Sequence, residues 1–326
     1  MNKRRFSGFL CVATSGCASL FLNPAAFANH GPGTSGGGAS TISGETLKEG
    51  MASLDLRFDY TNFKGVSDSE AAAKAIQHGG FDSLESAQVY TISFAYGLTS
   101  DWQIGAQIGY YVGHRFIDAE DDGMGGADIG TANPKGITDA WFTTKYRVMK
   151  GQPGNLSFIA GVKAPTGEDD HRLSNGELLE PSSQPGSGSV DFQLGAAYSR
   201  YLTTNITLDA SGLYTFRTRA HAFKVGDRAD LGVALAYRLT DDIKELPNLS
   251  VFVEALGVWI GKDNSNDAGT NPNSGGWTMY ISPGARCRLS QNLSATVAVL
   301  VPVLQELNGA QVKQEYRFTA GVTWTF

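Results

Sequence analysis

The sequence predicts an all-β fold: a transmembrane antiparallel β-barrel of about 12 strands with a flexible Gly-rich N-terminal leader. Three observations predict it. Apolar and polar residues alternate in twelve segments, the connections between these segments are alternately short and long, and charged residues keep to one face of every segment. No stretch after residue 28 approaches the roughly 18 consecutive apolar residues of a membrane-spanning helix.

Residues 1–28 have the features of a secretory signal peptide. Three basic residues at 3–5 precede a mostly apolar or small run over 6–22, and Ala26-Phe27-Ala28 fits the small-x-small cleavage pattern. We therefore expect cleavage after Ala28 and export to the outer membrane of a Gram-negative cell, where the protein would be integral.

Residues 29–49 form a leader rich in Gly and Ser without a hydrophobic period. Such a sequence has no core of its own, and ordering it would require contacts with the lumen of the barrel. We interpret it as a flexible tether or loosely inserted segment in preference to a plug, and we assign residues 50–326 to the barrel.

The strand pattern begins in 51–60, where apolar residues such as Leu54 and Leu56 alternate with Asp55, Arg57 and Asp59. This period of two predicts a strand with one apolar and one charged face. The alternation recurs near 90–96, 102–110, 140–148, 156–162, 190–198, 206–216, 229–237, 249–259, 279–287, 293–299 and 316–326. Most of these runs have about ten residues, the length that a tilted strand needs to cross the hydrocarbon layer.

The connections support a membrane barrel over a soluble sandwich. Short connections fall at 99–101, 150–154, 202–205, 240–248 and 290–292, while those at 64–84, 114–136, 166–187, 218–226, 261–276 and 303–313 are long or intermediate. Outer-membrane barrels have short periplasmic turns and long outer loops. Aromatic residues of the apolar face also gather at both ends of the strands, as expected at the two headgroup levels.

Charges on the second face predict a polar lumen, because a charge facing lipid near mid-bilayer costs about 2–4 kcal/mol. Eight acids and ten bases share this face, and their near-balance predicts a network of cross-strand pairs. The candidate lumen-lining residues are Asp55, Arg57, Asp59, Asp139, Trp141, Lys145, Arg147, Lys163, Asp191, Asp209, Arg217, Arg228, Asp230, Arg238, Glu254, Arg286, Arg288, Glu315 and Arg317.

Pro283 and Gly284 interrupt the predicted strand 277–289. Proline cannot donate to the ladder, so we expect a local break in pairing there. One interpretation is a bulge that bends the strand. The other is a lateral opening through which an apolar molecule would leave the lumen for the bilayer.

The chain ends in Thr323-Trp324-Thr325-Phe326. A C-terminal aromatic residue closing an alternating strand resembles the signal by which the barrel-assembly machinery recognises bacterial outer-membrane proteins. The resemblance implies that Phe326 is an assembly signal.

Several short segments resemble the outer-membrane transporter family named for the meta-pathway of phenol degradation. They are the leader from His30 to Gly38, Gly136-Ile137-Thr138-Asp139, Lys145-Tyr146-Arg147, Lys163-Ala164-Pro165-Thr166-Gly167, and the run from Glu180 to Ser189. The resemblance implies a barrel that passes small molecules, including hydrophobic or aromatic ones.

We therefore expect a passive channel or transporter for small molecules, with outer-membrane lipid, lipopolysaccharide and the assembly machinery as partners. The alternative is a structural or adhesive surface barrel that conducts nothing. An outer-membrane phospholipase is disfavoured because no histidine is positioned beside a lipid-facing serine, so no enzyme activity, cofactor or metal is expected. Histidines and acidic runs in the loops are interpreted as solvated. The net charge of −6 disfavours nucleic acid as a partner.

Overall fold

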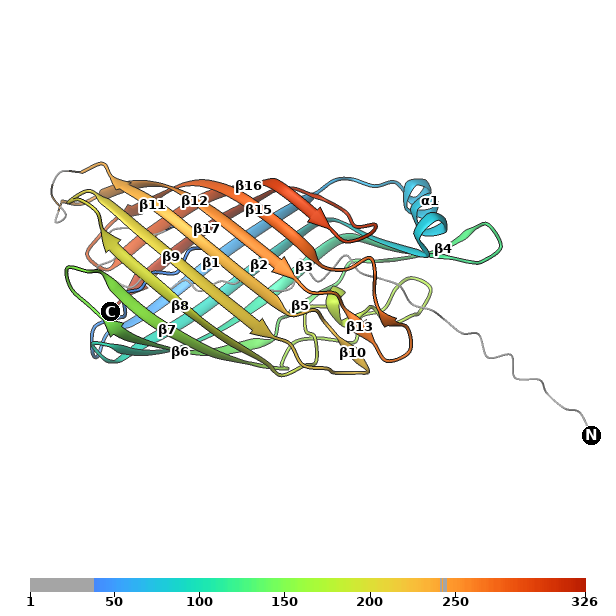
Figure 1. The fold of residues 1–326 in the computed structure, drawn as a ribbon, viewed down its shortest axis with the longest axis horizontal. Coiled ribbons are helices and arrows are strands. Elements are labelled where there is room, and N and C mark those ends of the chain that lie inside the picture. Colours follow the sequence, from blue (N-terminus) through green and yellow to red (C-terminus); the bar gives the residue numbers. More distant parts are fainter. Residues whose placement is uncertain (1–37, 241, 243–244) are drawn as a thin grey trace, which may run out of the picture.

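Twelve of the predicted strands close into a single antiparallel ring in the computed structural model, which describes residues 38–240, 242 and 245–326 (Figure 1). Strand β2 pairs with β1 and β3, and β1 pairs with β17, so the ring has no free edge. The ring strands are β1 (Ala52–Phe63), β2 (Gly80–Thr99), β3 (Trp102–Asp121), β6 (Ala140–Met149), β7 (Asn155–Ala164), β8 (Asp191–Tyr201), β9 (Ile206–Phe216), β11 (Arg228–Arg238), β12 (Asn248–Ile260), β15 (Gly276–Arg288), β16 (Leu293–Leu307) and β17 (Gln314–Thr325). The expected signal peptide and residues 29–37 of the leader lie outside the described residues.

The period of two separates the two faces of this wall. Leu56 is 53% exposed, whereas its neighbours Asp55 and Arg57 are 4% and 7% exposed. The apolar face is exposed on the outside of the ring, where lipid would lie, and the charged face is buried inside it. The predicted strand phase is therefore the observed one.

Two ring strands extend well beyond the membrane. β2 and β3 each have 20 residues, about 65 Å at about 3.3 Å per residue, against about 30 Å of hydrocarbon. β4 (Ala127–Ala132) continues the sheet from β3, and α1 (Asp68–His78) packs against β2 and β3 at the same end of the barrel (Figure 1). The end opposite these elements carries the short turns.

The helix α1 lies in a segment expected to be only a long loop. Ser67 caps its N-terminus, since the Ser67 hydroxyl accepts a hydrogen bond from the Glu70 amide at 3.2 Å, and Gly79 ends it with φ 84°. Ala71 and Ala75 form its buried side. In the described part of the chain, no helix combines the length and the apolar character needed to cross a membrane.

Short elements complete the loops at the α1 end. β5 (Lys135–Ile137) pairs with β3, and a small sheet joins the outer loops on the far side of the ring. That sheet consists of β10 (Phe223–Lys224), β13 (Asn264–Ser265) and β14 (Gly269–Thr270), and a 3-10 turn, η2, spans Pro181–Ser183.

The expected bulge at Pro283 is absent. Two residue pairs are missing between β15 and β16 there, but Ile281↔Val301 and Gly284↔Ala298 lie in the same register on either side of the gap. Pairing with β12 runs through Pro283 without interruption. The register shift on this strand lies instead at Met279/Tyr280. Pro283 therefore removes a local part of the ladder without changing the course of the strand.

Buried apolar residues form one large cluster and three small ones. The large cluster lies at the α1 end, where residues of β2 and β3 pack with α1 and with Leu173 and Leu179 of the loop after β7. Two of the small clusters combine a residue of the leader, Ala39 or Ile42, with residues of the barrel wall. The core of the protein thus lies within the barrel and above its outer mouth.

Candidate functional site: the lumen, its leader segment and its loop

The lumen face brings together most of the residues predicted for it. Fourteen of them are buried inside the ring, namely Asp55, Arg57, Asp59, Asp139, Trp141, Lys145, Lys163, Asp191, Asp209, Arg217, Arg228, Arg238, Glu254 and Arg286, and Arg147, Asp230, Arg288 and Arg317 are half-buried. Glu315 is the exception. It is exposed beside the register shift at Asn62/Phe63, where its carboxylate accepts a hydrogen bond from the Asn62 side-chain amide at 2.6 Å, so it lies apart from the buried charges.

Ion pairs join the charges into local clusters, as their balance predicted. Asp59 accepts from Arg57 Nε at 2.8 Å and lies 3.0 Å from a terminal nitrogen of Arg317. Arg228 pairs with Asp230 at 2.6 Å on another part of the wall. Each buried carboxylate in these clusters has a cationic partner, which offsets part of the cost of removing it from water.

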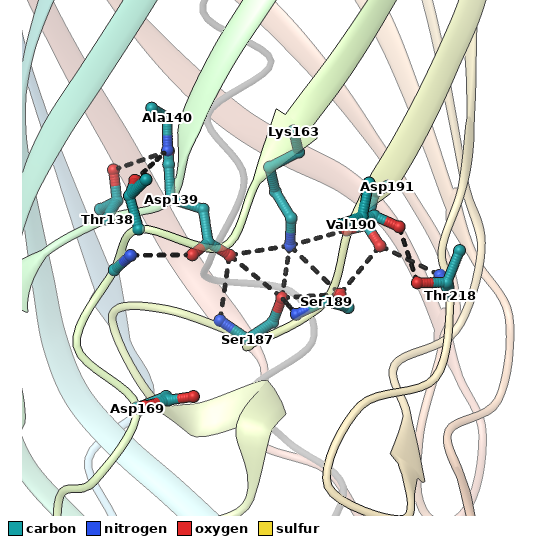
Figure 2. A network of polar contacts seen from close by, with 12 residues as sticks. Thr138, Asp139, Ala140, Lys163, Asp169, Ser187, Ser189, Val190, Asp191 and Thr218 are labelled. Carbon is teal, nitrogen blue, oxygen red and sulfur yellow. Dashed lines mark hydrogen bonds and ion pairs between the residues drawn. The ribbon is translucent and has the colours of Figure 1, made fainter.

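Near the outer mouth, Lys163 lies between two carboxylates (Figure 2). Its ammonium group is 2.8 Å from Asp139 Oδ2 and 2.7 Å from Asp191 Oδ2. Both oxygens of Asp139 also accept from the backbone of the following loop, from the Gly167 and Ser187 amides at 3.0 Å. The three charged residues therefore fasten the loop to the wall of the barrel.

This loop, residues 165–190, folds inward over the mouth. Leu179, Ser182 and Gln184 are each about 1% exposed, and the Gln184 side chain donates to the Leu179 carbonyl at 2.6 Å and accepts from the His171 amide. The sequence placed a long outer loop here, but it did not indicate that the loop would be buried. We call residues 165–190 the mouth loop.

The leader also enters the lumen. Residues 38–47, which we call the leader segment, are almost all buried. The Ser40 and Thr41 amides donate to Glu254 Oε1 at 2.9 and 2.7 Å, and Arg57 donates to the Ala39 carbonyl at 2.8 Å. Of the two forms that the composition favoured, a flexible tether or a loosely inserted segment, these contacts agree with the inserted one.

Toward the short turns, the leader segment lies directly on the backbone of the wall. The Gly44 amide donates to Ser199 Oγ at 2.7 Å, and Ser157 Oγ donates to the Gly44 carbonyl at 2.5 Å. A Cβ atom at position 44 would meet the Asn155 carbonyl oxygen at 2.2 Å. Lys145 donates to the Ser43 and Glu45 carbonyls. Position 44 therefore accommodates only glycine in this arrangement.

Between the leader segment and the outer mouth lies a cavity that we call the outer chamber. Its space free of atoms is about 940 Å³, part of it open to solvent. Ser40 and Ile42 of the leader segment contribute to its lining, and its walls carry both apolar and charged side chains, including Leu213, Leu256, Tyr280, Leu300, Arg228 and Arg317. A second cavity of about 550 Å³ lies against the mouth loop, with Trp141, Lys163 and Pro181 in its lining.

The sequence pattern did not identify several residues of these cavities. Tyr280 and Leu256 face inward, although the alternation assigns apolar residues to lipid, whereas Leu300 faces inward as its place in the alternation of strand 293–301 predicts. Their phase along the strands was the available signal, because each has the parity of a lumen position. Arg147 and Arg238 face inward as predicted but bind the short turns, through Asp101 and Asn205 respectively.

The described histidines and acids do not form a metal site. No group of three or more His, Cys, Asp or Glu side chains in the described ranges could hold an ion. His171 and His221 contact Glu168 and Asp169 instead, at 3.7 and 3.0 Å.

Comparison with solved structures supports the fold. The COG4313 outer membrane channel from Pseudomonas putida F1 aligns with a TM-score of 0.62 at 14% identity, over 86% of this chain and 97% of that one. The translocator domain of the autotransporter NalP from Neisseria meningitidis aligns at 0.46 and 13% identity, over 85% and 89% of the two chains. The CymD monoaromatic hydrocarbon channel aligns at 0.43 and 12% identity, over 86% and 89%. Only the first exceeds 0.5, and at this identity it bears on the fold alone.

No curated protein matches the chain at a significant level. A family model described as "Putative MetA-pathway of phenol degradation" matches residues 74–303, more than half of the chain. This match confirms the resemblance found in the short motifs, and the chain belongs to that family.

Proposed function

We propose that this protein is a passive outer-membrane channel for small molecules, hydrophobic and aromatic ones included. The observation that carries the proposal is a closed wall of twelve strands around cavities lined by both apolar and charged side chains. Barrels of this size lie between those filled by side chains and the wide porins. The family to which the chain belongs supports the same function.

In this conformation, we infer that the leader segment closes the lower lumen and the mouth loop closes the upper one. Both segments are held by hydrogen bonds to buried wall residues, and neither is part of the barrel ladder. The mouth loop also donates two backbone bonds to short outer strands, from Glu168 to Ile137 of β5 and from Ser174 to Thr131 of β4, but none of the bonds that hold either segment joins two strands of the ring. Such segments can leave without breaking the ring. Opening would thus require displacement of the leader segment, the mouth loop or both, while the wall stays intact.

The proposal involves no catalysis and no cofactor. Export through a signal peptide cleaved after Ala28, assembly through recognition of Phe326, and contact with lipid and lipopolysaccharide belong to it as expectations. A lateral opening at Pro283 remains an expectation: two β15–β16 pairs are missing there, while Phe252 lies against Gly284 on the inner side, 2.3 Å from where a Cβ atom would stand.

Planar-bilayer recordings of the purified protein test the proposal. The Ser43 and Ser199 hydroxyl oxygens are 3.0 Å apart, so a Ser43→Cys/Ser199→Cys variant, made in a Cys287→Ser background, can lock the leader segment to the wall. We expect low conductance when the pair is oxidised and higher conductance after reduction. The single Ser199→Cys variant is the control and should not respond to reductant.

The proposal would be contradicted if neither the wild-type protein nor the reduced Ser43→Cys/Ser199→Cys variant showed unitary conductance or solute flux. That result would favour the non-conducting structural or adhesive barrel. Equal conductance in the oxidised and reduced states of a conducting variant would exclude only the closing role of the leader segment.

A further inference from the structure

One wall of the outer chamber is an apolar patch made of Leu256, Tyr280 and Leu300. These residues lie on β12, β15 and β16, they are at most 8% exposed, and they form a contiguous cluster against which Val258 packs. Leu256 and Tyr280 are direct cross-strand partners. These apolar side chains point into a charged lumen, so contact with lipid does not explain them. They offer an apolar surface to a ligand inside the barrel.

A guanidinium group adjoins this patch. Arg317 is the cross-strand partner of Leu300, and side chains paired in this way have Cβ atoms about 5 Å apart on the same face. The Arg317 side chain is 21% exposed and lines the chamber. The chamber therefore presents an apolar surface and a cationic group side by side.

The donors of Arg317 are only partly used. One terminal nitrogen pairs with Asp59 at 3.0 Å, and Nε has no hydrogen-bond partner among the described residues. Asp59 is shared, because Arg57 binds both of its oxygens at 2.8 and 3.0 Å. Three arginines and two aspartates line the chamber, so its formal charge has one positive unit in excess.

From this juxtaposition we infer that the outer chamber binds a small aromatic monocarboxylate, with the ring on the apolar patch and the carboxylate on Arg317. A carboxylate matches the planar fork of a guanidinium. An uncharged hydrocarbon would leave the exposed part of the Arg317 guanidinium without a second anionic partner, and a small inorganic anion would leave the patch uncovered. Tyr280 adds an aromatic face to the ring site.

The inference rests on the proposed function, since it names the class of solute that such a channel would take. Ligand binding to the purified protein in detergent is measured independently of conductance. The binding site and the channel function can therefore be refuted separately.

Equilibrium dialysis with radiolabelled benzoate tests the inference, and competition with unlabelled benzyl alcohol and acetate compares the two halves of the ligand. We expect saturable benzoate binding, with benzyl alcohol and acetate each at least about tenfold weaker. Arg317→Gln should weaken benzoate binding about 10- to 100-fold, as for loss of a hydrogen-bonded charge pair, and should leave benzyl alcohol binding unchanged. Leu300→Ser should weaken both aromatic ligands.

The matched control is Arg147→Gln, because Arg147 pairs with Asp101 at the short-turn end, outside the chamber. This variant should bind benzoate like the wild type. Asp59 keeps Arg57 as a partner when Arg317 is replaced, and a heat-modifiable shift on gels verifies that each variant is folded. If Arg317→Gln does not fold, Arg317→Lys replaces it in the test. Lysine keeps the positive charge but lacks the planar guanidinium, so this variant should lose part of the affinity for benzoate.

Undiminished benzoate affinity in folded Arg317→Gln would overturn the inference, as would equal affinities for benzoate and benzyl alcohol in the wild type. Benzoate binding by a barrel without conductance would support the site and contradict the channel. Conductance without benzoate binding would leave the channel standing and remove the site.

Discussion

Gly44→Leu should displace the leader segment from the lumen. A Cβ atom at this position would lie 2.2 Å from the Asn155 carbonyl oxygen, 2.8 Å from the Ser199 amide nitrogen and 2.9 Å from the Ala197 carbonyl oxygen. Real Cβ atoms do not approach backbone this closely, and all three atoms belong to the ladder of the barrel wall. The leader segment, which is not part of the ladder, must therefore move.

The size of the effect follows from the bonds that are lost. Gly44 exchanges two hydrogen bonds with the Ser199 and Ser157 side chains. At about 0.5–1.5 kcal/mol each, their loss costs about 1–3 kcal/mol, which changes the ratio of inserted to withdrawn leader by roughly 5- to 150-fold. The steric overlap adds to this figure, so it is a lower bound.

The assay is the open probability of single channels in planar bilayers, together with maleimide labelling of a cysteine at position 41, where Thr41 is 1% exposed. We expect Gly44→Leu to raise both. Gly65→Leu is the control, because a Cβ atom at Gly65 would meet nothing within 4 Å. If position 41 becomes labelled while the open probability stays at the wild-type level, the leader segment does not close the channel.

Three further predictions concern the wall and the loops. A cysteine at Ile92 should react with a lipid-phase probe and one at Gln103 should not, since the two side chains are 46% and 2% exposed on opposite faces; the reverse result would contradict the strand phase. Pro283→Val should raise the melting temperature of the barrel without changing solute flux, because it allows the two missing β15–β16 pairs to form. A reduced flux of an apolar solute in this variant would support a lateral opening. Burial raises the pKa of Asp263 to about 7, against the opposing effect of its bond from the Gly226 amide. A carboxyl group with a raised pKa stabilises the folded state less as pH rises from its unfolded value toward 7. The protection of loop 261–276 against hydrogen exchange, taken relative to the intrinsic exchange rate at each pH, should therefore be lower at pH 8 than at pH 5, and Asp263→Asn should remove most of this difference in protection.

The sequence could predict the wall because lipid and lumen impose opposite requirements on alternate residues. Each of the twelve predicted segments overlaps a ring strand, and the connections alternate between short and long as expected, although β2 and β3 extend into the connections predicted at 64–84 and 114–136. Lys163, Asp139 and Asp191 were each predicted as lumen charges. The near-balance of acids and bases on that face predicted that such charges would pair across strands, as these three do.

The sequence could not predict the contents of the lumen, because they are set by contacts between distant residues. The bond from Thr41 to Glu254 joins positions 213 residues apart, and no local period in a Gly-rich segment indicates such a partner. The mouth loop is similar, since its polar residues bind Asp139 and one another. The helix α1 was missed for another reason, as its capping residues Ser67 and Gly79 were present but the segment was treated as a loop.

The pairing of β1 with β17 constrains the order in which the protein can be assembled. Thr323 bonds to Asp55 across 268 residues of chain, and the backbones of Ala52 and Phe326 exchange two hydrogen bonds at 2.7 and 2.9 Å. The loop that this seam closes contains nearly the whole barrel, so among the pairings of the ring strands it carries the largest loop-closure entropy.

The leader segment precedes β1 directly and lies within the ring that this seam completes. While the seam is open, the segment can enter from the side, through the gap between the first and the last strand. After closure it can enter or leave only through an end of the cylinder. A barrel whose seam closes before the leader segment is seated can therefore take that segment up only through one of its two ends.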